Sequence, residues 1–266
     1  MARRSSVPVV LTIAGSDSGG GAGLQADLKT FAALGVHGAC AVTCLTAQNP
    51  AGVWGIHPCP PAFLRRQLEA VWAELPPAAV KTGMLVAAGL IRALAAFLRE
   101  VGPVPLVVDP VMVATSGAPL LRAGARRVME RELFPLATVL TPNLPEAEAL
   151  LGRPLRGPED QAAAARELHR RHGCAVLVKG GHGRNRREAA DVLWDGGEAT
   201  WFRARRVGGV RTHGTGCTFS AALAGFLALG LSVREAAGLA KQVVDAAIRQ
   251  AVRIGRHHAL WPLPPG

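Results

Sequence analysis

Short runs of apolar and β-branched residues alternate along the chain with longer segments in which apolar positions recur every three or four residues. The short runs are typical of buried strands, and the longer segments are typical of amphipathic helices. Strands are predicted at residues 7–14, 38–47, 79–82, 106–109, 138–141, 175–179, 191–195 and 199–203. Helices are predicted at residues 24–34, 61–74, 86–100, 123–131, 143–151, 159–172, 217–229 and 233–254. This alternation predicts an α/β fold with a mostly parallel central sheet covered by helices on both faces.

The chain is expected to form one domain over residues 1–266. It is 49% hydrophobic, which supplies material for a large core and excludes a disordered chain. No Pro/Ser-rich or charged linker divides it, and α/β folds commonly reach about 250 residues as one domain. The last two predicted strands flank the Gly-Gly-Glu of residues 196–198 and are expected to pair as a hairpin.

Two long windows without charged residues, 30–64 and 212–233, are interpreted as buried core and not as membrane spans. Prolines interrupt the first, and the continuous apolar stretch of the second, residues 219–231, is shorter than the roughly 20 residues that a span needs. The five cysteines form no C-x-x-C pair, which argues against a disulfide framework and a zinc site and favours the cytoplasm.

The formal net charge of +11 fits either a nucleic-acid-binding protein or a protein that handles anionic substrates. The arginine clusters at residues 184–187 and 203–206 have no interleaved aromatic side chains for base stacking, apart from the adjacent Trp201 and Phe202. Nucleic-acid binding is therefore kept only as a minor alternative and no nucleic-acid partner is expected; the absence of a predicted span likewise predicts no membrane partner.

A glycine-rich segment, Gly-Ser-Asp-Ser-Gly-Gly-Gly-Ala-Gly at residues 15–23, connects the first predicted strand to the first helix. Such a loop exposes backbone N–H groups to a ligand. It lacks the Gly-Lys-Ser/Thr ending of a Walker A loop, and Leu24 stands where a dinucleotide fingerprint needs glycine. The segment is interpreted as a ligand-binding loop of another type, with a flexible turn as the alternative.

The segment His-Gly-Thr-Gly-Cys-Thr at residues 213–218 precedes a strongly apolar helix. Backbone N–H groups and the positive helix end would converge there on an anion such as phosphate. At this position the thiol of Cys217 is expected to have a lowered pKa and to serve as a base or nucleophile, although a small buried cysteine is the structural alternative. His213 is expected to be a hydrogen-bonding support.

Polar residues also follow other predicted strands, namely Asp109, Asn143, Glu146 and Lys179. Carboxylates supply oxygen to Mg²⁺ directly or through water, an amide can accept such a water, and a lysine neutralises phosphate oxygens. Together these side chains suit a metal-bound polyphosphate. Asn143 and Glu146 equally fit a helix capping box, and both roles can coexist.

These segments together resemble one enzyme family. They are residues 12–30, which contain the glycine-rich loop, Ala-Gln-Asn at 47–49, Lys-Thr-Gly-Met-Leu at 81–85, Asp-Pro-Val-Met at 109–112, Thr-Pro-Asn-Leu-Pro-Glu-Ala at 141–147, Lys-Gly-Gly-His at 179–182 and residues 213–218. In order, from about residue 7 to residue 250, they closely resemble hydroxymethylpyrimidine/phosphomethylpyrimidine kinases of the ribokinase-like superfamily. The resemblance implies a three-layer αβα domain, usually a homodimer, that phosphorylates the pyrimidine precursor of thiamine twice with ATP and Mg²⁺.

The resemblance also implies roles for individual residues. The pyrimidine pocket would comprise Gly15, Ala22, Asp27, Gln48, Met84 and Val111. Phosphoryl transfer would use Cys217 as base, the backbone of Gly214, Thr215 and Gly216, and Lys179. As a hypothesis from the chemistry of the side chains, ATP and Mg²⁺ would be held by Asp109, Asn143, Glu146, Lys179 and Thr215, with Asp109 and Glu146 on the metal directly or through water.

Pyridoxal kinase is the alternative activity, because related proteins with the same Gly-Thr-Gly-Cys segment phosphorylate vitamin B6 alcohols. Two features depart from the family pattern. Thr46 stands where relatives often have valine, and the C-terminal tail lacks the usual glycine-rich ending. Arg256, His257 and His258 in this tail are interpreted as a solvated basic surface and not as part of a site.

Overall fold

Nine strands form one large, mostly parallel sheet in the computed structural model, which describes residues 6–114, 117–181, 183, 187–210 and 213–261. The strand order is β3-β2-β1-β4-β5-β6-β7-β8-β9. Strands β2, β1, β4, β5, β6 and β7 run parallel, whereas β3 pairs antiparallel with β2, and β8 and β9 form an antiparallel pair beside β7. The strands are β1 (Val9–Asp17), β2 (His37–Asn49), β3 (Gly52–Pro58), β4 (Ala79–Thr82), β5 (Leu106–Val108), β6 (Val139–Leu140), β7 (Ala175–Val178), β8 (Glu188–Trp194) and β9 (Ala199–Arg205).

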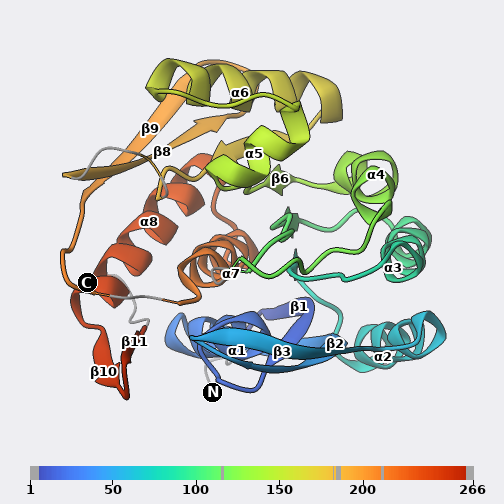
Figure 1. Ribbon diagram of the computed structural model, residues 1–266. Coiled ribbons are helices and arrows are strands. Elements are labelled where there is room, and N and C mark those ends of the chain that lie inside the picture. The colour runs from blue at the N-terminus through green and yellow to red at the C-terminus, as the bar shows by residue number, and fades with distance from the viewer. Residues whose placement is uncertain (1–5, 115–116, 182, 184–186, 211–212, 262–266) are drawn as a thin grey trace, which may run out of the picture.

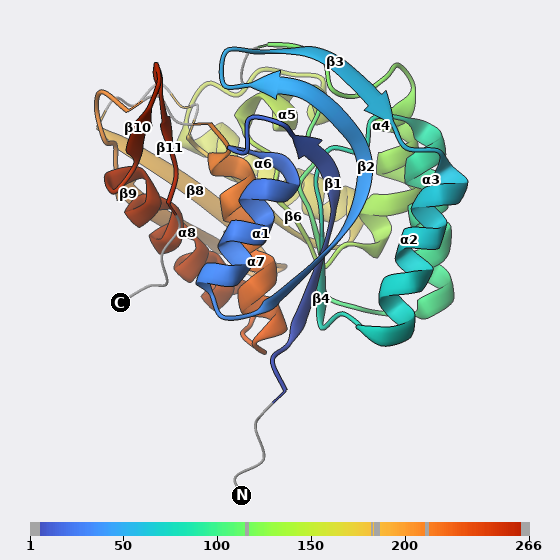
Figure 2. The same ribbon diagram turned by 90° about the horizontal axis from the view of Figure 1, so that it is seen from below.

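Helices cover both faces of this sheet, which gives the three layers visible in Figures 1 and 2. One layer contains α2 (Pro61–Glu74), α3 (Ala88–Val101), α4 (Ala125–Val128), α5 (Leu144–Leu151) and α6 (Pro158–His172). The other contains α1 (Gly23–Ala33), α7 (Thr215–Ala228) and α8 (Val233–Arg249). A small hairpin, β10 (Val252–Ile254) and β11 (His257–Ala259), follows α8.

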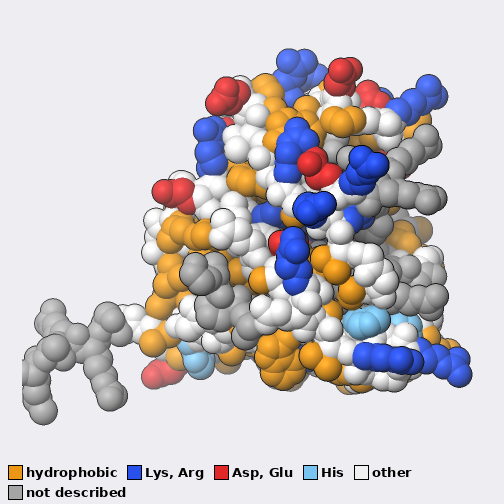
Figure 3. All heavy atoms as spheres, turned by 90° about the vertical axis from the view of Figure 1, so that its left-hand side faces the viewer, with side chains coloured by type: hydrophobic (Ala, Val, Ile, Leu, Met, Phe, Trp, Pro, Cys, Tyr) orange, Lys and Arg blue, Asp and Glu red, His pale blue; other side chains and the backbone are white. Residues whose placement is uncertain are grey.

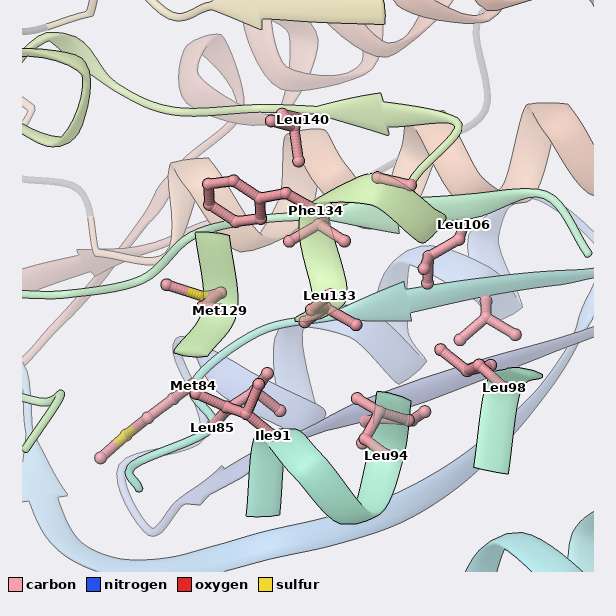
Figure 4. Close-up of a cluster of buried hydrophobic side chains, with 14 of the residues drawn as sticks. Met84, Leu85, Ile91, Leu94, Leu98, Leu106, Met129, Leu133, Phe134 and Leu140 are labelled. Carbon is pink, nitrogen blue, oxygen red and sulfur yellow. The ribbon is translucent and has the colours of Figure 1, made fainter. Parts of the chain in front are cut away.

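The central strands alternate between the two hydrophobic cores. In β5, Leu106 and Val108 pack in the core under α3, whereas Val107 between them packs in the core under α7. Because successive side chains of a strand point to opposite faces, an all-apolar strand can serve two cores at once. Figure 4 shows the first core, where side chains of α3, of β5 and of residues 129–134 converge.

The predicted three-layer αβα class and all eight predicted strands are confirmed, with shifts at their ends. Strand β3 was missed, because two glycines and a terminal proline conceal its alternation. It lies at the sheet edge, so the expectation that residues 30–64 are all buried is wrong there: Trp54 of β3 is 67% exposed.

The other differences concern helix ends. Helix α8 ends at Arg249 and not at residue 254, because the chain turns into the hairpin, where Gly255 has a φ of 58°. The helix predicted at 123–131 is a short α4 followed by a π-helical turn, Met129–Leu133, and a 3-10 turn, Phe134–Leu136. In the tail, Arg256 is exposed and His257 and His258 are partly exposed in β11, which agrees with the expectation of a basic surface.

Helix α7 is the most deeply buried helix of its layer, and its packing against the sheet can be tested. Leu223 has no exposed surface, whereas Leu229, which follows the same helix, is 45% exposed. Leu223→Ala is expected to lower the free energy of unfolding by about 2–5 kcal/mol in urea denaturation, through lost burial and a residual cavity. Leu229→Ala is the matched control and should cost less than about 1 kcal/mol. Equal losses would contradict the assigned core.

Candidate active site

A cavity of about 410 Å³ lies at the carboxyl ends of the parallel strands. Each of the six parallel strands contributes a lining residue at or just beyond its end, and the first turn of α7 closes the floor. Asn143 and Lys179, which follow β6 and β7, form a bridge that places these two strand ends side by side. Ligands of open α/β sheets bind at this edge, so the fold concentrates the candidate residues where chemistry is expected.

Asp17, at the end of β1, organises the glycine-rich loop. Its carboxylate accepts hydrogen bonds from the N–H groups of Gly19, Gly21 and Ala22 at 2.8, 3.1 and 2.8 Å. The loop is also held at Gly23, where φ is +53° and a β-carbon would lie only 2.3 Å from the carbonyl oxygen of Gly15. The loop is therefore a fixed wall of the cavity and not a flexible turn.

The start of α7 supplies an anion cradle. Gly214 caps this helix with a φ of +85°, and no side chain accepts a hydrogen bond from the first-turn N–H groups. These donors, at Thr215, Gly216 and Cys217, have no partner within the helix, and with the positive helix end they favour an anion. A β-carbon at Gly214 would lie 1.9 Å from the carbonyl oxygen of Gly21, so only glycine lets the two loops pack together.

Cys217 lines the cavity from this first turn, but its acidity differs from the prediction. Burial raises the pKa of its thiol to about 11, although the nearby Lys81 charge acts in the opposite direction. The expectation of a lowered pKa is therefore wrong: desolvation outweighs the helix end and the neighbouring cation. Cys217 rests as a neutral thiol at neutral pH.

A buried ion pair lies on one side of the cavity floor. Lys81 Nζ donates to both carboxylate oxygens of Asp27 at 3.0 and 2.8 Å, and Thr12 Oγ1 donates to Asp27 at 2.6 Å. Both charged side chains have no exposed surface. Burial alone would lower the pKa of Lys81, but the negative charges of Asp27 and Asp109 raise it, so the ammonium stays charged.

A second lysine–carboxylate pair lies across the floor. Lys179 Nζ donates to Asp109 at 2.7 Å, and Asp109 also accepts from Thr141 and Ser220, both at 3.2 Å. Burial would lower the pKa of Lys179, but Asp109 and Glu146 raise it. The lysine is thus a fixed positive charge beside the anion cradle, since its Nζ lies 3.2 Å from the position of a β-carbon at Gly216.

Asn143 and Glu146 form the capping box that their spacing indicates. The Asn143 side chain accepts from the Glu146 N–H at 2.9 Å, and the Glu146 carboxylate accepts from the Asn143 N–H at 2.8 Å. Burial raises the pKa of Glu146 to about 7, with Lys179 acting against this shift. Both residues nevertheless line the cavity, so the cap and the ligand site share one helix end.

The carboxylates of Asp109 and Glu146 fit a magnesium ion that arrives with phosphates. Mg²⁺ is commonly held by one or two carboxylates, with phosphate oxygens and waters as the other ligands. Across residues 6–114, 117–181, 183, 187–210 and 213–261, no three His, Cys, Asp or Glu side chains form a complete metal site. Asp109 and Glu146, which line the cavity beside the anion cradle, therefore fit a magnesium ion that phosphate oxygens and waters would also ligate.

The remaining cavity wall was not predicted. One face of α8 lines it with Lys241, Val244, Asp245 and Ile248, whose spacing of three and four residues follows the helical repeat. Lys241 is anchored by Asp191 at 2.7 Å. Figure 3 shows the side of the molecule that carries α8 and β9, where Lys and Arg side chains gather. Arg205 and Arg206 of this region also line the cavity.

The structure brings together all the predicted site residues except one. Gly15, Ala22, Gln48, Met84, Val111, Asp109, Asn143, Glu146, Lys179 and residues 214–217 line the cavity. Asp27 does not reach it and lies behind Lys81, which lines it instead. Asp17 and Lys81 stood within recognised segments without an assigned role. His182, Arg184 and Arg186 lie outside the described residues.

The parallel sheet, the glycine-rich wall, the anion cradle and the two buried lysines define a kinase of the ribokinase-like class. The family model for Phosphomethylpyrimidine kinase matches residues 17–261. This chain therefore belongs to the phosphomethylpyrimidine kinase family.

Individual relatives agree with this assignment. The chain is 45% identical to the hydroxymethylpyrimidine/phosphomethylpyrimidine kinase of Synechococcus elongatus over 251 residues, covering 94% of this chain and 95% of that protein. It is 51% identical to the thiamine biosynthesis bifunctional protein ThiED of Geobacter sulfurreducens, covering 96% of this chain and 52% of that protein, so it spans about half of its length. The solved structure of the Staphylococcus aureus pyridoxal kinase in complex with AMP-PCP and pyridoxal aligns with a TM-score of 0.87 at 34% identity, covering 97% of this chain and 94% of that one.

The neutral resting state of Cys217 predicts slow thiol chemistry. In a Cys40→Ser/Cys59→Ser variant, which lacks the exposed and the half-buried competing thiols, the rate of iodoacetamide labelling at Cys217 should rise about tenfold per pH unit from pH 7 to 10. The same variant with Cys217→Ser measures residual labelling at the buried cysteines. A rate that levels off below pH 9 would show that the helix end dominates after all.

Proposed function

We propose that this protein transfers the γ-phosphoryl group of ATP to the hydroxymethyl oxygen of 4-amino-5-hydroxymethyl-2-methylpyrimidine, and then phosphorylates the resulting monophosphate to the diphosphate. The observation that carries this proposal is the single cavity that joins two kinds of surface. Gln48, Met84 and Val111 offer an amide and apolar walls suited to an aminopyrimidine, and the start of α7 with Lys179 offers a phosphate cradle.

The proposed reaction depends mainly on position and charge. The hydroxymethyl oxygen attacks the γ-phosphorus in line, while the N–H groups of residues 214–216 and the Lys179 ammonium stabilise the developing negative charge. When bound, magnesium would neutralise phosphate oxygens, with Asp109 and Glu146 holding it directly or through water.

Cys217 is the proposed base for the hydroxyl proton. Only its thiolate can accept a proton, and the ammonium groups of Lys81 and Lys179 favour that thiolate against the cost of burial. In a loose transition state the charge is spread over the oxygens of the transferred phosphoryl group and little covalent chemistry is required of the protein, so a small thiolate population is sufficient. The proton passes from the substrate oxygen to sulfur as the new P–O bond forms and the bond from the γ-phosphorus to the bridging oxygen breaks, so that ADP leaves.

We also propose a cytoplasmic homodimer. None of the helices in the described part of the chain is long and apolar enough to cross a membrane. All five cysteines are free, as a reducing compartment favours. Strand β3 is an edge strand of the sheet. Its Trp54 and the neighbouring Leu45 of β2 are exposed, and such an edge favours pairing with a second copy. Sedimentation equilibrium tests the dimer.

Activity on separate substrates tests the proposed function. Purified protein with ATP and Mg²⁺ should convert the hydroxymethylpyrimidine to its diphosphate and should convert the monophosphate to the same product, as identified by mass. Pyridoxal is the third substrate, because the structural relative is a pyridoxal kinase. Turnover on pyridoxal alone would overturn the substrate assignment, and turnover on none would overturn the kinase activity on these classes.

A further inference from the structure

One ring nitrogen of His213 faces two polar side chains of the cavity. Its Nε2 lies 3.2 Å from Asp17 Oδ2 and 3.2 Å from the side-chain nitrogen of Gln48. All three residues line the cavity, and the His213 and Asp17 side chains are only 12% and 2% exposed. The hydrogen atom on this ring nitrogen therefore determines how Gln48 is presented to a ligand.

Asp17 requires that hydrogen to be present. Its carboxylate already accepts three backbone N–H groups of the glycine-rich loop. Burial alone would raise the pKa of Asp17, but its hydrogen bonds with His213, Gly19 and Ala22 lower it, so the group is ionised. A bare ring nitrogen would place its lone pair against this carboxylate, whereas an N–H donates to it. His213 thus donates from Nε2.

Only the side-chain amide of Gln48 can adjust to the N–H donor of His213. Its backbone is fixed, because Ser18 Oγ donates to the Gln48 carbonyl at 2.7 Å and accepts from the Gln48 N–H at 2.9 Å. A bulge in the pairing of β2 with β3 falls between Ala47 and Gln48 and sets the direction of this side chain. Two N–H donors facing each other repel, and a half-turn of the amide exchanges its nitrogen and oxygen with little change of shape. We therefore assign the amide with Oε1 toward His213, so that Oε1 and Asp17 share the single Nε2 hydrogen in a three-centre bond.

The site is built to hold this ring. A β-carbon at Gly21 would lie 3.0 Å from Cδ2 of His213, so glycine leaves the space that the imidazole needs. His213 sits directly before the anion cradle, and Gly21 lies on the opposing loop. His213 thus connects the phosphate end of the cavity to Gln48, the residue proposed to bind the substrate ring.

We propose that His213 is a specificity-determining positioning residue. Asp17 holds the His213 ring, and His213 in turn fixes the side-chain amide of Gln48 so that the NH₂ group of Gln48 faces the substrate. The site then selects rings that have a nitrogen acceptor next to the carbon that bears the amino group. This inference rests on the proposed function for its substrate. The second lone pair of Oε1 remains available to the substrate's amino group. Without His213, the amide loses its fixed orientation and the preference weakens.

Two substitutions separate positioning from mere structure. His213→Leu removes the donor with similar bulk, and His213→Gln replaces it with an amide N–H. For the hydroxymethylpyrimidine, His213→Leu should raise KM about five- to tenfold with kcat changed less than about twofold, and His213→Gln should restore most of the loss. The matched controls are His57→Leu and His57→Gln, since His57 is exposed on β3 and away from the cavity.

Two further readouts make the assignment specific. Wild-type protein should prefer the pyrimidine over its analogue with C–H in place of the ring nitrogen next to the amino-bearing carbon, and His213→Leu should shrink that preference about five- to tenfold. In a Gln48→Met background, His213→Leu should add less than about twofold to KM, because the two residues act through one contact.

Specific outcomes overturn the inference. Unchanged substrate preference in His213→Leu, no rescue by His213→Gln, or fully additive effects of the Gln48 and His213 substitutions would each show that His213 only supports the loop. If the wild-type protein does not phosphorylate the pyrimidine, the proposed function fails and the inference fails with it. If wild type is active and only these comparisons fail, the proposed function stands.

Discussion

Two buried lysine–carboxylate pairs set the constraint on which the site depends. Lys81 with Asp27 and Lys179 with Asp109 place two positive charges at the cavity floor, where solvent screens them little. A buried ammonium needs such a partner, because removing one member of a buried pair costs about 3–5 kcal/mol. The carboxylates therefore keep both lysines charged for an incoming phosphate, and the two ammonium groups favour the thiolate of Cys217 when it forms.

The layered fold is what brings these pairs to the first turn of α7. Asp27 comes from α1, Lys81 from the end of β4, Asp109 from the end of β5 and Lys179 from the end of β7. Only a parallel sheet places so many strand ends at one edge, and helices on both faces allow its strands to be apolar throughout. The glycine at position 214 then lets its loop approach the glycine-rich loop until backbone touches backbone, and Gly21 on the latter leaves room for the His213 ring.

The sequence predicts what depends on local pattern. Apolar alternation identifies the layers, and the Asn143–Glu146 spacing identifies a capping box that the structure confirms. Features that depend on tertiary surroundings could not be predicted. The spacing of Lys241 and Ile248 indicates that they share one helix face, but it does not indicate that this face lines the cavity. The position of Cys217 at a helix start does not reveal how strongly burial raises the pKa of its thiol. Asp27 was placed in the substrate pocket by resemblance, whereas the structure places it behind Lys81.

The most direct test of the mechanism is the single-turnover rate of phosphoryl transfer by Cys217→Ser with ATP, Mg²⁺ and the hydroxymethylpyrimidine. Serine preserves the shape of the anion cradle but is a far weaker acid than a thiol, so the rate should fall about 10²- to 10⁴-fold while ATP affinity stays near the wild-type value. A rate within a few-fold of wild type would contradict the role of Cys217 as base and leave the charges and the helix end as the whole of the catalysis.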